Sequence, residues 1–511
     1  MKKVLNSAFS RAVIVGIFML IQAAILVVML LLFQEYWVYF YAVCFAITML
    51  AVLHIINSNS NPAYKIAWIL PIMFFPIFGG LFYLVFGKDR LSRHELKKMS
   101  EIEEKYNASM KITAHSLSAL KEESKEAALQ ASYIYNVSDA PPYSHTSTEF
   151  LPIGETMFER MMQELEKAEK FIFMEYFIIN EGTMWDSMLE LLEKKVKQGV
   201  DVRVMYDDFG CLFTLPSNYA KQLNARGIKA CIFNRFVPVL SSRFNNRDHR
   251  KICVIDGNVG FTGGINLSDE YINAYAKHGH WLDCGIMLKG EAVWSLTVMF
   301  LSMWYFVRNE TESFDTYAPD IEFVKTIETD GFVQPFTDTP MDNEPVGETV
   351  YMNIINRAKD YVYICTPYLI IDNEMITALS TAAKSGVDVR IITPHIADKV
   401  YVHAMTRSYY SILIEAGVKI YEYTPGFIHS KTFVADDEYG VVGTINLDFR
   451  SLFLHYECAV WMYRSSALGA MKENYLTTLE ACQEITYDMA VNVPWYSKIF
   501  RPILRIFAPL M

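Results

Sequence analysis

The chain begins with a long region in which polar residues are rare. Residues 12–33 are apolar apart from Gly16 and Gln22, and residues 37–56 form a second apolar run soon afterwards. Each run has about twenty residues, the number that an α-helix needs to cross a hydrocarbon core. The pattern therefore predicts two transmembrane helices. A cleaved signal peptide is the alternative for the first run, but that run is too long and lacks a small-residue cleavage site.

A third apolar run, residues 66–86, is interrupted by two prolines and two glycines, Pro71, Pro76, Gly79 and Gly80. These residues disfavour a single straight helix. Lysine and arginine flank the run on both sides, and such residues concentrate on the cytoplasmic side of membranes. A re-entrant hairpin is therefore favoured over a third span. Residues 1–90 are expected to anchor the chain in a membrane, with the remainder on the cytoplasmic side.

Beyond the anchor, residues 91–145 are rich in Glu and Lys, which predicts a charged, solvated helical connector. From residue 146 onwards, segments with helical periodicity alternate with short apolar runs typical of β-strands. The alternation occurs twice, and residues 199–203 (GVDVR) are identical to residues 386–390. The predicted fold is α/β. It consists of two duplicated domains, residues 146–330 and 331–490, around a pseudo-twofold axis.

The final segment, residues 491–511, mixes aromatic and aliphatic residues with Lys498, Arg501 and Arg505. This composition predicts a basic amphipathic helix that lies on an anionic membrane surface. A last helix that simply packs on the second domain is the alternative.

The overall composition fits a membrane-anchored protein with large polar domains. Hydrophobic residues make up 52% of the chain and charged residues 20%. The net charge of −11, without a basic stripe, argues against nucleic acid as a partner. The eight cysteines show no CxxC spacing, so neither a disulfide framework nor a zinc site is predicted.

Each copy of the repeat contains one H-x-K-x-x-x-x-D string, from His249 to Asp256 and from His429 to Asp436. Side chains alternate between the two faces of a strand, so each histidine shares a face with the lysine two residues later, Lys251 or Lys431. The aspartates have the opposite parity. As members of the motif, Asp256 and Asp436 are grouped with the catalytic residues, but this parity leads us to expect that they hold a turn beside the site rather than face the substrate.

A G-x-x-N group follows each string and ends at Asn266 or Asn446. Two lysines and two asparagines that converge with the histidines would enclose a phosphate and stabilise its developing charge. The lysines would do the work of a cation, so no metal or other cofactor is expected. Two histidines suit a double displacement at phosphorus, in which one attacks and the other transfers protons.

Each imidazole needs a carboxylate to fix its tautomer. Asp283 and Glu457 lie downstream of the histidines in corresponding parts of the two copies, and both are candidates for this role. Glu175 lies within an apolar strand, where a carboxylate needs a partner, and is a further candidate. Its counterpart in the second copy is not acidic.

The paired strings and G-x-x-N groups resemble the phospholipase D superfamily, whose fold is two α/β domains with one shared central site. Over nearly its whole length the chain is similar to the bacterial cardiolipin synthases. The resemblance is carried by residues 61–90, by MEYF at 174–177, by NLDFRS at 446–451 and by the ending RPILRIFAPLM. It implies reversible phosphatidyl transfer between two phosphatidylglycerol molecules, with release of glycerol. It also implies that His249 is the nucleophile and His429 the general acid and base. Phosphatidylglycerol and anionic membrane lipid are the expected partners.

Some positions depart from the family pattern. A serine often follows the glycine of G-x-x-N, but here the residues are Gly264 and Thr444, and His455 stands where the family often has Asn. Motifs do not determine the acceptor, so a phospholipase D-type hydrolase or another phosphatidyltransferase remains an alternative. A membrane-tethered nuclease is a more distant one. The oligomeric state is not predicted.

Overall fold

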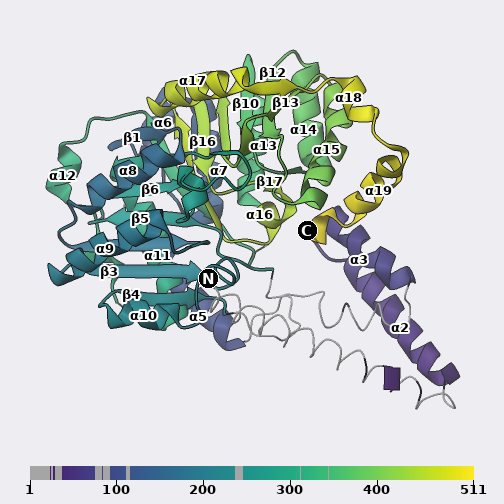
Figure 1. The fold of residues 1–511 in the computed structure, drawn as a ribbon, viewed down its shortest axis with the longest axis horizontal. Coiled ribbons are helices and arrows are strands. Elements are labelled where there is room, and N and C mark those ends of the chain that lie inside the picture. Colours follow the sequence, from purple (N-terminus) through teal and green to yellow (C-terminus); the bar gives the residue numbers. More distant parts are fainter. Residues whose placement is uncertain are drawn as a thin grey trace.

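The computed structural model describes residues 37–74, 93–110, 116–235, 245–310, 312–342 and 344–510, together with residues 24, 27, 28, 31 and 83. Within these residues, two large mixed β-sheets form the centre of two similar halves (Figure 1). The first sheet has the strand order β1-β8-β6-β5-β2-β3-β4. In that order the strands are Thr146–Leu151, Gly285–Gly290, Val259–Gly263, Lys251–Ile255, Phe171–Tyr176, Asp201–Asp207 and Lys229–Phe233.

The second sheet has the order β9-β18-β16-β15-β10-β12-β13-β19. Its strands are Phe332–Asp338, Glu457–Tyr463, Tyr439–Gly443, Thr432–Ala435, Tyr361–Cys365, Asp388–Pro394, Lys419–Tyr423 and Cys482–Glu484. Without β19, this order matches the first sheet strand for strand, and each pair of neighbours has the same parallel or antiparallel direction in both sheets. The identical GVDVR segments lead into β3 and β12. The prediction of a duplicated α/β fold is confirmed.

Helices cover the outer face of each sheet because their apolar residues recur at helical spacing. In α9, for example, Trp185, Met188 and Leu192 are all buried. The outer helices of the first half are α8 (Gly154–Leu165), α9 (Thr183–Lys197) and α10 (Tyr219–Ala225). Those of the second half are α13 (Val346–Arg357), α14 (Asn373–Lys384) and α15 (Val400–Glu415). The short helical segments are η4 (Asp269–Ile272), η5 (Phe314–Tyr317), α12 (Ile321–Lys325), α16 (Phe449–Phe453), α18 (Tyr487–Val491) and η6 (Ala508–Leu510).

A shared core joins the two halves. The inner faces of both sheets contribute to it, with α11 (Val293–Arg308) from the first half and α17 (Ala467–Glu480) from the second. Ile252 and Leu288 of the first sheet belong to the same buried cluster as Val442 and Val460 of the second. Each half also has its own core beneath its outer helices. The halves are therefore held together by apolar burial, the dominant favourable term in such interfaces.

The connector is helical, as predicted, but it is not merely solvated. It consists of α5 (Arg93–Met110), α6 (Ser116–Glu123) and α7 (Lys125–Ser138). Ala127, Ala131 and Ile134 of α7 are buried in the core of the second half. The amide of Gln334 in β9 donates to the carbonyl of Ala131 at 3.0 Å. The expectation of a solvated segment is therefore wrong for α7, because these small apolar residues form a face that packs on the sheet.

Near the N-terminus, helix α2 (Trp37–Ile56) covers the second predicted span, and α3 (Pro62–Phe74) covers the first part of the third apolar run. Figure 1 shows both helices extending away from the two halves, close to the C-terminus. The predicted span 12–33 and the rest of 66–86 lie outside the described ranges. None of the helices in the described ranges combines the length and apolar character needed to cross a membrane. The transmembrane prediction is therefore unconfirmed.

The C-terminal helix α19 (Trp495–Ile506) packs on α15 and α3. The guanidinium of Arg505 lies 4.5 Å from the centre of the Tyr409 ring on α15. Trp495, Ile499 and Phe500 are 74%, 54% and 61% exposed. The helix is thus docked through its arginine-bearing side and presents its large apolar side chains outward.

Candidate active site

Short strand pairings across the interface bring the two motifs together. Strand β7 (His280–Leu282) of the first half pairs in parallel with β14 (Gly426–Ile428) of the second. On the other side, Asp248 forms a parallel bridge with Tyr456. The amide of His249 donates to the carbonyl of Tyr456 at 2.9 Å, and the amide of His429 donates to that of Leu282 at 2.7 Å. Each histidine is therefore fixed by the backbone of the opposite half.

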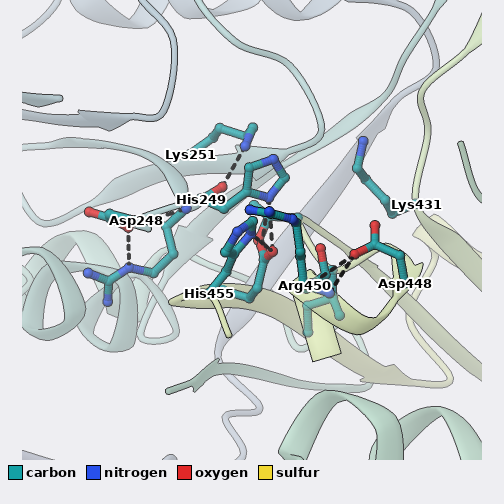
Figure 2. Close-up of polar contacts among 12 residues, drawn as sticks. Asp248, His249, Lys251, Lys431, Asp448, Arg450 and His455 are labelled. Atoms are coloured by element: carbon teal, nitrogen blue, oxygen red, sulfur yellow. Dashed lines mark hydrogen bonds and ion pairs between the residues drawn. The ribbon is translucent and has the colours of Figure 1, made fainter. Parts of the chain in front are cut away.

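A cavity of about 620 Å³ lies at this junction, and side chains from both halves line it. It is bordered by both motif histidines and both motif asparagines. The other lining residues include Arg247, Tyr271, Lys277, Trp281, Tyr368, Lys399, Tyr401, Arg450 and His455. Figure 2 shows His249 and Lys251 on one side of this region and Lys431 on the other. A large cavity with convergent cationic and imidazole groups has the features of a ligand site.

Each histidine contacts a carboxylate from the other half. The Nδ1 atom of His249 lies 2.9 Å from Oε1 and 3.0 Å from Oε2 of Glu457. The Nδ1 atom of His429 lies 2.6 Å from Oδ2 of Asp283. A proton on Nδ1 that is bonded to a carboxylate leaves the lone pair on Nε2, the nitrogen on the far side of the ring. The sequence suggested these two carboxylates; their exchange between halves is a structural finding.

The lysines lie beside the histidines, as the strand alternation predicts. Lys431 Nζ is 2.8 Å from Nδ1 of His429 and donates to the carbonyl of the same residue. Lys251 Nζ donates to the carbonyl of His249. Both lysines are buried. They supply positive charge beside two imidazoles that face one cavity.

Two further short pairings position the asparagines. Leu267 forms a bridge with Ile179, and β17 (Leu447–Asp448) pairs with β11 (Leu369–Ile370). The amide oxygen of Asn266 accepts from Ile178 at 3.0 Å, while its Nδ2 donates to the Tyr271 hydroxyl at 2.7 Å.

Asn446 differs from Asn266 in its hydrogen bonding. Its Oδ1 is buried, and no hydrogen bond reaches that atom within the described residues. Both asparagines border the cavity, and Oδ1 of Asn446 can accept a hydrogen bond from a donor group of a ligand.

The residues after the two motif glycines hold the orienting carboxylates. Thr444 Oγ1 donates to Oε2 of Glu457. At Gly264 a Cβ atom would lie 2.1 Å from Oδ1 of Asp283, so that carboxylate fills the space of a side chain. Position 444 thus supports a carboxylate, whereas position 264 makes room for one.

The two motif aspartates lie at turns outside the lining of the cavity. Asp256 accepts from the amides of Glu169, Lys170 and Phe171, at 2.7–2.8 Å. Asp436 makes the same three contacts with residues 359–361, at 2.7–3.0 Å. Their placement agrees with the parity argument. A catalytic role, the other interpretation of an H-x-K-x-x-x-x-D string, does not suit these positions.

Glu175 is buried against the middle of the first motif. Its Oε1 lies 2.6 Å from the guanidinium of Arg250, which also bonds Asp248 at 3.1 Å. In the second half the matching residues are Cys365 and Ser430, so both charges are absent there together. Glu175 therefore supports the motif strand from behind rather than lining the cavity.

Burial dominates the electrostatics of the site. It lowers the pKa of His249 to about 3 and that of His429 well below its usual value. It also lowers the pKa of Lys251 to about 8 and that of Lys431 to about 7. Both imidazoles are consequently neutral near pH 7, as a nucleophile or a general base requires.

The two carboxylates behave differently. Burial raises the pKa of Asp283 to about 7. Burial also acts to raise the pKa of Glu457, but His249 and His455 outweigh it and hold this pKa well below the usual range. Glu457 is therefore ionised near neutral pH, whereas the group around Asp283 can retain a proton.

Among the cavity residues to which the sequence assigned no role are Arg247, Arg450 and His455, of which only His455 was noted, as a departure from the family pattern. Arg247 shares the parity of His249 and Lys251, so the alternation could have revealed it. Arg450 lies within the NLDFRS segment that carries the family resemblance. The ring of His455 lies 5.5 Å from that of His249, and its Nδ1 is 3.6 Å from Oε1 of Glu457 (Figure 2).

Comparisons with known proteins show the family and the fold. The family model described as the phospholipase D-like domain of cardiolipin synthase matches residues 161–304 and 351–477. A phospholipase D-nuclease N-terminal model matches residues 46–88. The crystal structure of phosphatidylserine synthase from Haemophilus influenzae aligns with a TM-score of 0.54. It covers 75% of this chain and 96% of that one at 14% identity, which shows a common fold.

Relatives with similar sequences cover most of the chain. An uncharacterized protein of Streptococcus mutans is 44% identical over 90% of this chain and 99% of its own length. The cardiolipin synthase of Alkalihalophilus pseudofirmus is 34% identical over 89% of this chain and 90% of its own length, and that of Geobacillus kaustophilus gives the same figures. With both halves matched by the domain model and curated relatives aligned over 89% of the chain, the chain belongs to the phospholipase D-like cardiolipin synthases, a family of phosphatidyltransferases.

Proposed function

We propose that this enzyme joins two phosphatidylglycerol molecules into cardiolipin and glycerol through a phosphohistidine at His249. The reciprocal pairing of each motif histidine with a carboxylate of the opposite half carries the proposal. It supports two neutral imidazoles on one cavity, each with Nδ1 held and Nε2 available. Double displacement at phosphorus needs this pair of groups.

In the first step, Nε2 of His249 attacks the phosphorus of the donor lipid. A P–N bond forms and the P–O bond to the headgroup glycerol breaks. His429, which is neutral at rest, is protonated for this step by the adjacent Asp283, whose pKa is about 7, and donates a proton to the departing glycerol oxygen. Lys251, Lys431 and the amide of Asn446 stabilise the charge that develops on the phosphoryl oxygens.

In the second step, His429 takes a proton from a headgroup hydroxyl of the second phosphatidylglycerol. That oxygen attacks phosphorus, the P–N bond breaks, and cardiolipin leaves the site. Ionised Glu457 favours the cationic phosphorylated ring of His249, while Lys431 and Asp283 beside His429 can supply a proton. This asymmetry supports His249 as the nucleophile.

The exposed apolar surface supports work at a membrane. Val38 and Leu50 of α2 are 76% and 67% exposed, and α19 presents its aromatic side chains outward. Figure 1 places these helices on the same side of the molecule. The proposal is a multi-pass protein of the bacterial plasma membrane, with the catalytic halves on the cytoplasmic side and anionic lipid against α19.

The test uses full-length protein in detergent with labelled phosphatidylglycerol as the sole lipid and a chelator present. Equal amounts of cardiolipin and glycerol are expected. Phosphatidic acid without cardiolipin would identify a hydrolase instead. No reaction until a second lipid is supplied would identify a different phosphatidyltransferase.

A further inference from the structure

His455 is a buried histidine that the proposed reaction does not use. Its side chain is 10% exposed, and neither ring nitrogen has a hydrogen bond among the residues that the structure describes. Its one polar contact is with Oε1 of Glu457, 3.6 Å from Nδ1, which is longer than a hydrogen bond. Burying a ring whose polar atoms are so weakly satisfied is unfavourable. The ring can therefore take a ligand in addition to its contact with Glu457.

The neighbours of His455 have the chemistry of a metal site. One ligand atom each from His249, His455 and Glu457 lie within 4.8 Å of one another. Oε1 of Glu457 is 2.9 Å from Nδ1 of His249 and 3.6 Å from Nδ1 of His455. The hydroxyl of Thr444 donates a hydrogen bond to the other carboxylate oxygen, Oε2. Oε1 is the oxygen that lies near both imidazoles.

The ligand set and its surroundings select one class of ion. Two imidazoles and one carboxylate, with a fourth position open, are a common set for four-coordinate Zn²⁺. Both histidines border the cavity, so an ion can reach them from there and the cavity supplies the fourth position. Thr444 acts as the outer partner that orients the ligating carboxylate.

We infer that His249, His455 and Glu457 bind Zn²⁺, and that the bound ion blocks the enzyme. Zn²⁺ takes the lone pair at Nδ1 of His249, and the displaced proton moves to Nε2 of the same ring. The ring stays neutral but loses the lone pair that attacks phosphorus. The inhibitory effect rests on the proposed function of His249, whereas binding of the ion does not.

The test separates binding from activity. Full-length protein, stripped with chelator, is titrated with Co²⁺, whose visible absorption reports coordination, and Zn²⁺ is then added in competition. The variants are His455→Asn, His455→Gln as a second probe, and His145→Asn as the matched control at an exposed histidine outside the cavity. Loss of one ligand should weaken binding by more than about tenfold, since even an outer partner is worth about 10–100-fold.

Turnover of phosphatidylglycerol is measured on the same samples, relative to the metal-free rate of each variant. Zn²⁺ should inhibit wild-type protein and His145→Asn reversibly, while both His455 variants need at least about tenfold more ion. Unchanged Co²⁺ affinity and spectrum in the His455 variants would overturn the site, as would absence of binding to wild type. If wild type binds Zn²⁺ through His455 but makes no cardiolipin in chelator, the metal site stands and the proposed function fails.

Discussion

At the scale of single residues, the two motif histidines are not equivalent. His249 faces an ionised carboxylate, and His429 faces Asp283 with Lys431 beside it. The difference arises from the carboxylate and lysine that contact each ring, because both imidazoles are buried to a similar extent. It gives distinct chemical tasks to two residues of identical type.

Trapping the intermediate tests these tasks. With donor lipid labelled on phosphorus, His429→Ala should slow turnover by about 10²–10⁴-fold, the usual worth of a general acid and base. It should still accumulate labelled protein, whereas His249→Ala should give none. Acid-quenched gels with counting of the protein band provide the measurement. Label on His249→Ala but not on His429→Ala would reverse the assignment.

The protonation of Lys431 should make kcat/KM depend on pH. Its pKa of about 7 means that it is cationic below that pH and neutral above it, so kcat/KM should fall as the pH rises through 7 to 8. The groups that act on it are Asp283, Lys251 and Glu457, with His429 in contact. A pH profile of wild type and Lys431→Arg checks this. The variant remains charged, so its profile should lose the fall; an identical fall would assign the titration to another group.

At the scale of elements, the turn after β6 is matched to the carboxylate that it faces. Position 264 has no side chain because Asp283 fills the space where Cβ would lie. The corresponding turn after β16 carries Thr444, whose hydroxyl holds Glu457. The two turns have the same place in the fold but different contacts.

Gly264→Ala should therefore impair catalysis. The added Cβ must push Asp283 away from His429, and loss of the orienting carboxylate should lower kcat by about a hundredfold or more. Steady-state kinetics and thermal unfolding check the effect. Gly469→Ala on α17 is the control, because its Cβ would meet no atom within 4 Å. An unchanged kcat in Gly264→Ala would show that Asp283 does not depend on this space.

The elements also show what a sequence can and cannot predict. The repeat and the strand alternation identified both sheets and both His/Lys pairs, because these depend on local periodicity. The exchange of Asp283 and Glu457 between halves depends on which strands meet across the interface, which spacing does not encode. Burial of α7 was not predicted, because the sequence around it is rich in charged residues and its apolar face consists mainly of small alanine side chains. Arg247 has the same parity as His249 but precedes the motif, so the motif spacing alone does not single it out.

At the scale of the whole molecule, the C-terminal helix should contact lipid. Brominated phosphatidylglycerol quenches tryptophan in contact with acyl chains. In reconstituted full-length protein, Trp495→Phe should remove part of the quenchable emission, since Trp495 is 74% exposed on α19. Trp461→Phe, at a site buried in the second half, should leave the quenchable part intact. Equal quenching of wild type and Trp495→Phe would place α19 away from the bilayer.

The reciprocal carboxylates have a consequence for the population of active molecules. If the halves shift apart, His249 and His429 lose their carboxylate partners at the same time. Separation of the halves therefore inactivates both histidines together. Lipid binds only docked molecules, because both halves line the cavity. A substitution in the shared apolar core, far from any lipid, would therefore raise the apparent KM as the docked fraction falls, and saturating lipid would restore kcat by favouring the docked state.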